Sequence, residues 1–149
     1  EHLERARPVL EVVAQRVTRM GESGAGQVTK LCNQVIVGCV FPVLAEAVRL
    51  AEAAGVDASM LPEALKGGFA DSLPLQVFGP RMARRDFANP SGTAHTLLKD
   101  LENAAAVARD AAVPMPMAHT AAELYRLLLA QGRGDEEPSV FVELLTGAR

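Results

Sequence analysis

Residues 35–45 read Val-Ile-Val-Gly-Cys-Val-Phe-Pro-Val-Leu-Ala, an almost wholly apolar run within a chain of 149 residues. The run is shorter than the roughly 20 residues that a membrane-spanning helix needs. Polar residues flank it, with Asn33 and Gln34 on one side and Glu46 and Arg49 on the other. This pattern predicts a helix that is buried in the core of a soluble domain.

A longer helical pattern surrounds this run and extends from residue 24 to residue 54, where Gly55 ends it. Pro42 lies inside the pattern and has no N–H to donate to the carbonyl of Gly38. Since a glycine four residues before a proline relieves the steric clash, we expect a kink there. Other helices are expected over residues 3–15, 58–65, 72–82, 93–112, 117–130 and 139–145, and we expect the 72–82 helix to be interrupted near Gly79 and Pro80.

The fold class follows from the spacing of apolar residues, which recur at helical rather than alternating intervals along most of the chain. Aromatic residues are few, at 4% of the sequence. The exception is residues 16–20, Arg-Val-Thr-Arg-Met, which are typical of a short strand although no other strand pattern could pair with them. The sequence predicts an all-α helical bundle around one long kinked helix, with one N-terminal strand.

Charge and cysteine usage narrow the choice of partners and compartment. The formal net charge is −3 and the Lys and Arg residues are scattered, which argues against a nucleic-acid or anionic-membrane surface. Cys32 and Cys39 would lie about 10 Å apart along one helix, too far for a disulfide. Residues 1–19 are charged throughout and lack a signal-peptide pattern. We therefore expect reduced core thiols in a cytoplasmic protein.

Residues 30–34, Lys-Leu-Cys-Asn-Gln, place an amine and two amides within about one turn of the long helix. A lysine that gives or takes a proton, beside amides that hold hydroxyl or carboxylate oxygens, suits the oxidoreduction of a hydroxy acid. Such chemistry needs a nucleotide cofactor, yet neither Gly24 and Gly26 nor Gly132 and Gly134 complete the Gly-x-Gly-x-x-Gly fingerprint of a dinucleotide site. The cofactor would be held by residues outside this chain.

Several stretches carry a family resemblance through their order and spacing: residues 20–34, 51–57, 98–101, 114–116 and 132–136. Together they resemble the C-terminal helical domain of the β-hydroxyacid dehydrogenases, which is similar to that of 6-phosphogluconate dehydrogenase. The resemblance implies that residues 21–149 form a helical substrate and dimerisation domain. It also implies that residues 1–20 are the last helix and strand of an NAD(P)-binding Rossmann domain whose remainder is absent here.

The resemblance also implies residue roles: Lys30 as the catalytic lysine, Asn33 and Gln34 as substrate-binding amides, and Lys99, Asp100, Gly24 and Gly26 as contacts to the cofactor. Of the two amides we expect Gln34 to hold substrate and Asn33 to support it. Without the resemblance, Lys30 is better explained as a solvated surface lysine. Lys99 is then explained equally well as a surface lysine paired with Glu102 or Asn103.

The implied activity is an NAD- or NADP-dependent reduction of a small semialdehyde, and this fragment is expected to be inactive alone. The segments 33–34, 51–57, 65–68 and 99–100 look most like the members that reduce 2-hydroxy-3-oxopropanoate (tartronate semialdehyde) to glycerate. Relatives often carry an aromatic residue where this chain has Gly92, so the pocket must differ there. Alternatives are a dehydrogenase of 3-hydroxyisobutyrate or threonate type or, in another class, a non-catalytic helical interaction module.

The remaining polar candidates do not form a second site. His95 precedes Lys99 by one helical turn, but no further ligand is placed to complete a zinc set, and His119 has only polar neighbours such as Thr120 and Glu123. We expect packing or solvent roles for both histidines and no metal. Because the long helix is more apolar than one small domain needs, we also expect a homo-oligomer, a dimer or tetramer.

Overall fold

The computed structural model describes residues 2–88 and 90–145, and every regular element within them is helical. The longer helices are α1 (His2–Val13), α2 (Ala25–Ala53), α4 (Leu73–Arg84), α5 (Ala94–Asp110) and α6 (Pro116–Ala130). The short ones are η1 (Ala58–Met60), α3 (Leu61–Leu65), η2 (Pro138–Val140) and α7 (Phe141–Leu144). The expected all-α class is confirmed.

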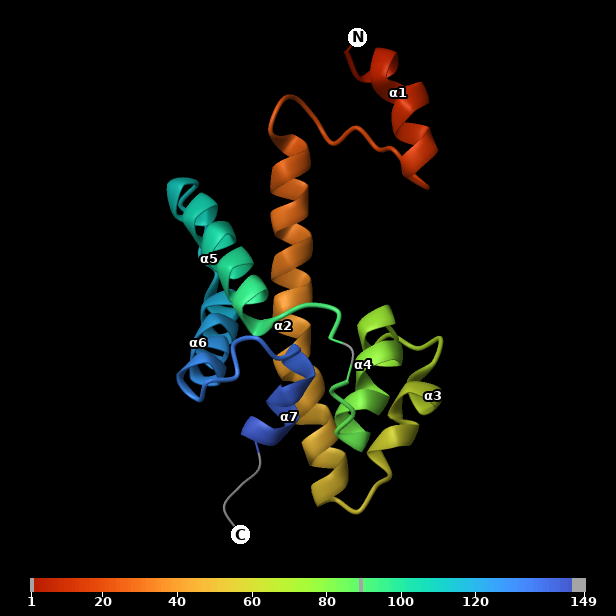
Figure 1. The fold of residues 1–149 in the computed structure, drawn as a ribbon, viewed down its shortest axis with the longest axis vertical. Coiled ribbons are helices and arrows are strands. Elements are labelled where there is room, and N and C mark those ends of the chain that lie inside the picture. Colours follow the sequence, from red (N-terminus) through yellow and green to blue (C-terminus); the bar gives the residue numbers. More distant parts are fainter. Residues whose placement is uncertain (1, 89, 146–149) are drawn as a thin grey trace.

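Helix α2 is the axis of the bundle (Figure 1). Helices α5 and α6 pack on one side of it, α3 and α4 lie on the other, and α7 contacts its C-terminal half. The core where these helices meet contains the fully buried side chains of Tyr125, Phe141, Met82, Leu101 and Leu128. Helix α2 therefore lies between two groups of helices and contacts both.

By length and composition α2 could cross a membrane, and it is the one helix of the described residues that could. Its packing instead supports the role of a core helix. Helices α4, α5, α6 and α7 all contact it, and Phe41, Ala45 and Val48 on its inner face are buried. These contacts are those of the core helix that the apolar run predicts.

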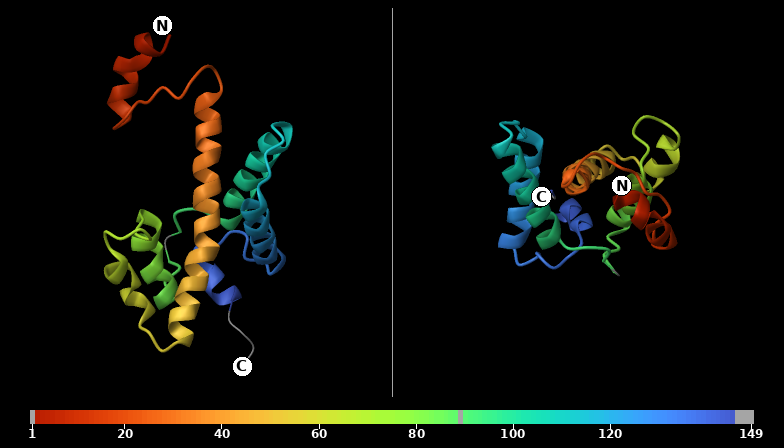
Figure 2. Two further views of the ribbon diagram at one scale, coloured as in Figure 1. Left: turned by 180° about the vertical axis from the view of Figure 1, so that it is seen from behind. Right: turned by 90° about the horizontal axis from the view of Figure 1, so that it is seen from above.

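Pro42 is accommodated inside α2 by a partner from another helix. The missing N–H of Pro42 leaves the carbonyl of Gly38 without its helical donor. The Tyr125 hydroxyl of α6 donates to that carbonyl at 3.1 Å. Burial raises the pKa of Tyr125 well above its ordinary value of 10.0, so the hydroxyl keeps the proton that it donates. The helix stays continuous and bends gently in its C-terminal half (Figure 2).

Gly38 has a second role, because α5 approaches α2 at this position. A Cβ on residue 38 would lie 2.9 Å from Cδ2 of Leu101, closer than two carbon atoms can pack. The absence of a side chain at Gly38 thus allows α5 to pack against α2, and its carbonyl accepts the hydrogen bond that compensates for Pro42.

The predicted strand over residues 16–20 is wrong. Residues 14–24 form an irregular connection between α1 and α2. A strand needs a neighbour to take its backbone hydrogen bonds, and the described residues offer none. The helix beside it is real: α1 stands apart from the bundle in Figures 1 and 2, and none of its residues is buried.

The expected interruption near Gly79 and Pro80 is also wrong, since α4 runs unbroken through both. Gly79 is buried against α3, where an added Cβ would lie 3.2 Å from Cγ of Pro62. Leu75 and Met82 on the same face are buried as well. Tertiary packing along this face holds the helix together across the one hydrogen bond that Pro80 cannot make.

Candidate functional site

The candidate site lies where α2 and α5 come together, and a side-chain hydrogen bond joins the two helices there. Gln34 of α2 donates from Nε2 to Oδ2 of Asp100 on α5 at 2.6 Å. Gln34 is buried, and the Asp100 side chain is only 16% exposed. Residues predicted from separate parts of the sequence are thus brought into direct contact.

Asn33 completes a short chain of hydrogen bonds. Its Nδ2 donates to Oε1 of Gln34 at 2.8 Å, so the Gln34 amide is held at both ends. Because a carboxylate only accepts, Asp100 requires the Gln34 nitrogen to face it, and the orientation of the amide is fixed. An amide has two donors and two lone pairs, so Gln34 keeps one N–H and one lone pair for a ligand. This geometry fits the expected division in which Asn33 supports Gln34.

Lys99 lies beside the same carboxylate. Its Nζ is 3.2 Å from Oδ1 of Asp100, while its side chain is 64% exposed. Without the family resemblance, the sequence suggested that Lys99 pairs with Glu102. That pairing is wrong, because Lys99 pairs with Asp100 and Glu102 pairs with Arg126 of α6 at 2.7 Å. Asp100 therefore links an exposed cation to the buried amide.

The remaining predicted site residues make no hydrogen bond to Asn33, Gln34 or Asp100 within the part of the chain that the structure describes. Lys30 is exposed, lies one helical turn before Gln34 on α2, and within the described residues makes no side-chain hydrogen bond or ion pair. Gly24 and Gly26 lie a further turn or more away, at the start of α2. Gly24 has a φ of +92°, a left-handed conformation that glycine adopts readily, and it lets the backbone turn into α2.

A cavity of about 230 Å³ opens beside Gln34. Its walls come from α2, α4, the segment that precedes α5, the start of α5, and η2, and they include Gly92, Thr93 and Pro138. A Cβ on Gly92 would meet no atom within 4 Å, so the absence of a side chain there leaves the cavity open. Gln34 and Gly92, which the sequence singled out independently, line the same space.

A buried ion pair behind this cavity was not predicted. Glu137 is fully buried, and Nη1 of Arg81 on α4 donates to its Oε1 at 3.0 Å. The same oxygen accepts from the backbone N–H and the hydroxyl of Ser91, each at 2.9 Å, and Oε2 accepts from Ser139. The signal available in the sequence was a glutamate directly before the apolar segment 138–142, a place where a charge must be paired.

The histidines and cysteines add no second centre. His95 packs over Gly134, where a Cβ would fall 2.3 Å from its Nε2, and His119 is exposed. Both cysteines are free, but Cys32 is exposed, so the expected core position is wrong for that residue. Among the described residues, no group of three or more His, Cys, Asp or Glu side chains is placed to hold a metal ion.

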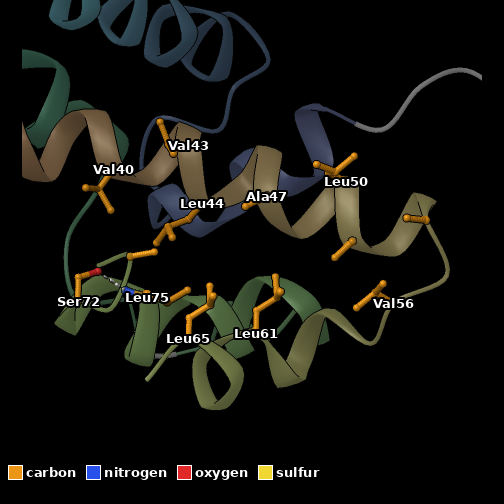
Figure 3. A pocket seen from close by; sticks show the side chains of 13 residues that line it. Val40, Val43, Leu44, Ala47, Leu50, Val56, Leu61, Leu65, Ser72 and Leu75 are labelled. Atoms are coloured by element: carbon orange, nitrogen blue, oxygen red, sulfur yellow. Dashed lines mark hydrogen bonds between the residues drawn. The ribbon is translucent and has the colours of Figure 1, made fainter. Parts of the chain in front are cut away.

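A larger cavity of about 590 Å³ lies between the C-terminal half of α2 and the η1, α3 and α4 segment (Figure 3). Side chains such as Leu44 and Leu75 line it, and its one polar residue, Ser72, uses its hydroxyl to accept from the Leu75 N–H at 3.2 Å. A space without titratable or free polar groups has nothing to orient a hydroxy acid. The smaller cavity at Gln34 is the better candidate site.

Comparisons with known proteins identify the family of this chain. The family described as NAD-binding of NADP-dependent 3-hydroxyisobutyrate dehydrogenase matches residues 24–145. The chain is 36% identical over 142 residues to 2-hydroxy-3-oxopropionate reductase of Escherichia coli, covering 95% of this chain and 48% of that protein. It is 34% identical over 151 residues to NAD-dependent L-serine dehydrogenase of Pseudomonas aeruginosa, covering 97% and 50%.

A solved structure shows the same fold. The 3-hydroxyisobutyrate dehydrogenase of Salmonella typhimurium superposes with a TM-score of 0.86 at 26% identity, over 96% of this chain and 50% of that one. The chain therefore spans about half the length of the curated relatives and the structure that it matches. It belongs to the 3-hydroxyisobutyrate dehydrogenase family, as a helical domain of that family.

Proposed function

We propose that this chain is the substrate-binding half of an NAD(P)-dependent β-hydroxyacid dehydrogenase that reduces 2-hydroxy-3-oxopropanoate to glycerate. The observation that carries the proposal is the Gln34 amide, fixed by Asp100 at the mouth of a cavity and one helical turn from Lys30. The site offers an amine, an oriented amide and space for a small acid. Family membership favours this reading over a non-catalytic interaction module.

In the proposed reaction the substrate is held by hydrogen bonds to the free N–H and lone pair of Gln34. When bound, a nicotinamide cofactor would supply the hydride that the aldehyde carbon receives. Lys30 gives a proton from Nζ to the carbonyl oxygen, which becomes the hydroxyl of the product, and in the reverse direction its neutral amine takes that proton back. Asn33 and Asp100 act by keeping the Gln34 amide in place.

The residues assigned to the cofactor fit such a group. The ammonium of Lys99 is exposed, and the positions of Gly24 and Gly26 leave open space where a Cβ would meet no atom within 4 Å. We propose that Lys99, Asp100 and these glycines line the near side of the cofactor. Most of its binding would come from a preceding domain, and α1, which stands apart from the bundle, would belong to that domain together with residues up to 20.

The choice of substrate rests on the resemblance to the Escherichia coli reductase and on the open position at Gly92. The test is a panel of substrates offered to the full-length protein with NADH and NADPH, or with the oxidised cofactors for the alcohols. The panel contains 2-hydroxy-3-oxopropanoate, 3-hydroxyisobutyrate, threonate and L-serine. We expect the highest kcat/KM with 2-hydroxy-3-oxopropanoate. A higher value with another member would reassign the substrate, and no turnover at all would refute the dehydrogenase.

We further propose that the protein is a cytoplasmic homo-oligomer that binds neither nucleic acid nor membrane. Val28, Ile36, Val43 and Leu50 recur every seven or eight residues along α2, and all four are exposed. Such a stripe is suited to burial against another helix. Sedimentation of the full-length protein should give a dimer or tetramer, and a monomer at micromolar concentration would contradict this assignment.

A further inference from the structure

We propose that Arg81 and Glu137 are positioning residues that fix the part of the substrate cavity wall formed by residues 91–93 and Pro138, and through that wall set substrate affinity and selectivity. Neither residue lines the cavity itself. The inference rests on the proposed function only where it concerns substrate. Its structural part, the fixing of the wall, stands on the contacts of these two side chains.

The Glu137 carboxylate joins three separate parts of the chain. It accepts from Arg81 on α4, from Ser91 in the segment before α5, and from Ser139 in η2, at 2.8 to 3.0 Å. With its side chain fully buried, its charge must be compensated by these donors. Hydrogen bonds to a charged acceptor are about twice as strong as those between neutral groups, so the carboxylate is a firm anchor for the Ser91 backbone.

Arg81 holds the same segment from its other end. Its Nε donates to the carbonyl of Asp86 at 3.2 Å, and its Nη2 donates to the carbonyl of Ala88. One planar guanidinium thus contacts two backbone carbonyls and the Glu137 carboxylate together. A lysine at this position could keep the charge but could not reproduce the three-way geometry.

The anchored atoms adjoin the cavity wall directly. Ser91, Gly92 and Thr93 line the cavity, and so does Pro138, the residue after Glu137. Gly92 has no side chain, and a Cβ added there would meet no atom within 4 Å. Side-chain packing at Gly92 therefore does not hold this part of the wall in place. The hydrogen bonds of Arg81 and Glu137 hold the Ser91 end of this wall. Its other end is held by the N–H groups of Ala94 and His95, which donate to the carbonyls of Glu136 and Gly134 at 2.9 Å.

A wall held in this way acts on binding rather than on proton transfer, which occurs at Lys30. Loosening it would leave the cavity less complementary to one acid and more tolerant of others. Complete loss of a hydrogen bond to a charged group corresponds to about 10-fold to 100-fold in an equilibrium constant, which is the upper limit for an effect on affinity transmitted through the wall. We therefore expect KM to rise by about 10-fold in a mild variant while kcat changes little.

The experiment compares Arg81→Lys and Glu137→Gln with Ser139→Ala in the full-length protein. The first two variants weaken the anchors of the wall, whereas Ser139→Ala removes a buried hydrogen bond from the Oε2 side of Glu137 and leaves the Ser91 and Arg81 contacts intact. Kinetics are measured on the substrate panel, and hydrogen exchange is measured at the Ser91 amide.

We expect Arg81→Lys and Glu137→Gln to raise KM, to reduce the kcat/KM ratio between the best and second-best substrates, and to speed exchange of the Ser91 amide. Ser139→Ala removes one donor of the same carboxylate but keeps the Ser91 and Arg81 contacts, so it should have a clearly smaller effect on each of these quantities. An unchanged KM and exchange rate in both test variants would overturn the inference, and so would an equal effect of Ser139→Ala. If the parent protein turns over no member of the panel, the dehydrogenase assignment fails, and Ser91 exchange alone decides whether the wall is fixed as proposed.

Discussion

At the scale of single residues, the site depends on the fixed orientation of the Gln34 side-chain amide. Gln34 is fixed between Asn33, which donates to its oxygen, and Asp100, which accepts from its nitrogen. A glutamine free to rotate would present donor and acceptor interchangeably to a ligand. The carboxylate of Asp100 removes that freedom, and a defined N–H and lone pair remain for the substrate.

The Gln34–Asp100 contact should be measurable as a coupling energy. In a double-mutant cycle on the free energy of unfolding, Gln34→Ala and Asp100→Ala should couple by about 1.5–3 kcal/mol, the range for a hydrogen bond to a charged group. The matched comparison is the Glu102–Arg126 pair, an exposed contact between α5 and α6. Its coupling should stay below about 1 kcal/mol. Additive effects of the two site substitutions would show that Asp100 does not hold the amide.

At the scale of elements, α2 shows how a helix passes a proline in the core. Pro42 removes one hydrogen bond, Tyr125 replaces the missing donor, and Gly38 makes room for Leu101 at the same point. Close packing against α5 and α6 thus supports the central helix at the point where it lacks a backbone hydrogen bond.

Two glycines of α2 should respond differently to the same substitution. Gly38→Ala places a methyl group 2.9 Å from the Leu101 side chain and should lower the free energy of unfolding by about 1–3 kcal/mol. Gly26→Ala meets no atom within 4 Å, and alanine favours the helix by up to about 1 kcal/mol, so it should be neutral or stabilising. Urea denaturation of both variants is the measurement. Equal losses would mean that the close approach of α5 does not depend on Gly38.

Helical periodicity was sufficient to predict most of these elements from the sequence, because α2, α5 and α6 each bury one continuous face. The strand at residues 16–20 was predicted from local propensity, and propensity does not supply a pairing partner. The break at Gly79 and Pro80 was predicted from two residues whose cost is offset by packing against Pro62. Tertiary contacts decided both cases.

The candidate site likewise contains residues that the sequence could indicate and residues that it could not. Lys30, Asn33, Gln34 and Asp100 could be named as candidates because they lie in the short motifs that carry the family resemblance. The Arg81–Glu137 pair was not, since its members are 56 residues apart and meet only when η2 docks beside α4. A buried charge gives little local signal, because its partner can come from any element.

At the scale of the whole molecule, an ion pair joins the C-terminal ends of α2 and α4. Arg85, the residue that follows α4, forms a two-point contact with Glu52 of α2, with distances of 2.7 and 3.0 Å. The hydrogen bond from Arg85 is the largest influence on Glu52, and with Arg49 it holds the pKa of that carboxyl below its ordinary value of 4.5. The ionised form is therefore favoured in the folded state.

This pair gives stability a defined pH dependence. Because the folded pKa of Glu52 is lowered, its contribution is complete above about pH 4.5 and is lost as the pH falls through the lowered value. Glu52→Gln should lower the free energy of unfolding by up to about 1 kcal/mol at pH 7 and by progressively less below pH 4. Urea denaturation of the parent and the variant at pH 7 and below pH 4 measures the difference in the free energy of unfolding. A difference that grows on acidification would have the wrong sign for this pair.

Lys30 is the most direct test of the account, because the proposed chemistry depends on its proton. In the full-length protein, Lys30→Ala should lower kcat for 2-hydroxy-3-oxopropanoate by at least about 100-fold, the lower range for loss of a general acid. Lys66→Ala is the matched control, an exposed lysine that pairs with Glu63 at 3.7 Å. The account predicts a large loss of kcat in the first variant and parental kcat in the second. Parental kcat in Lys30→Ala would contradict it.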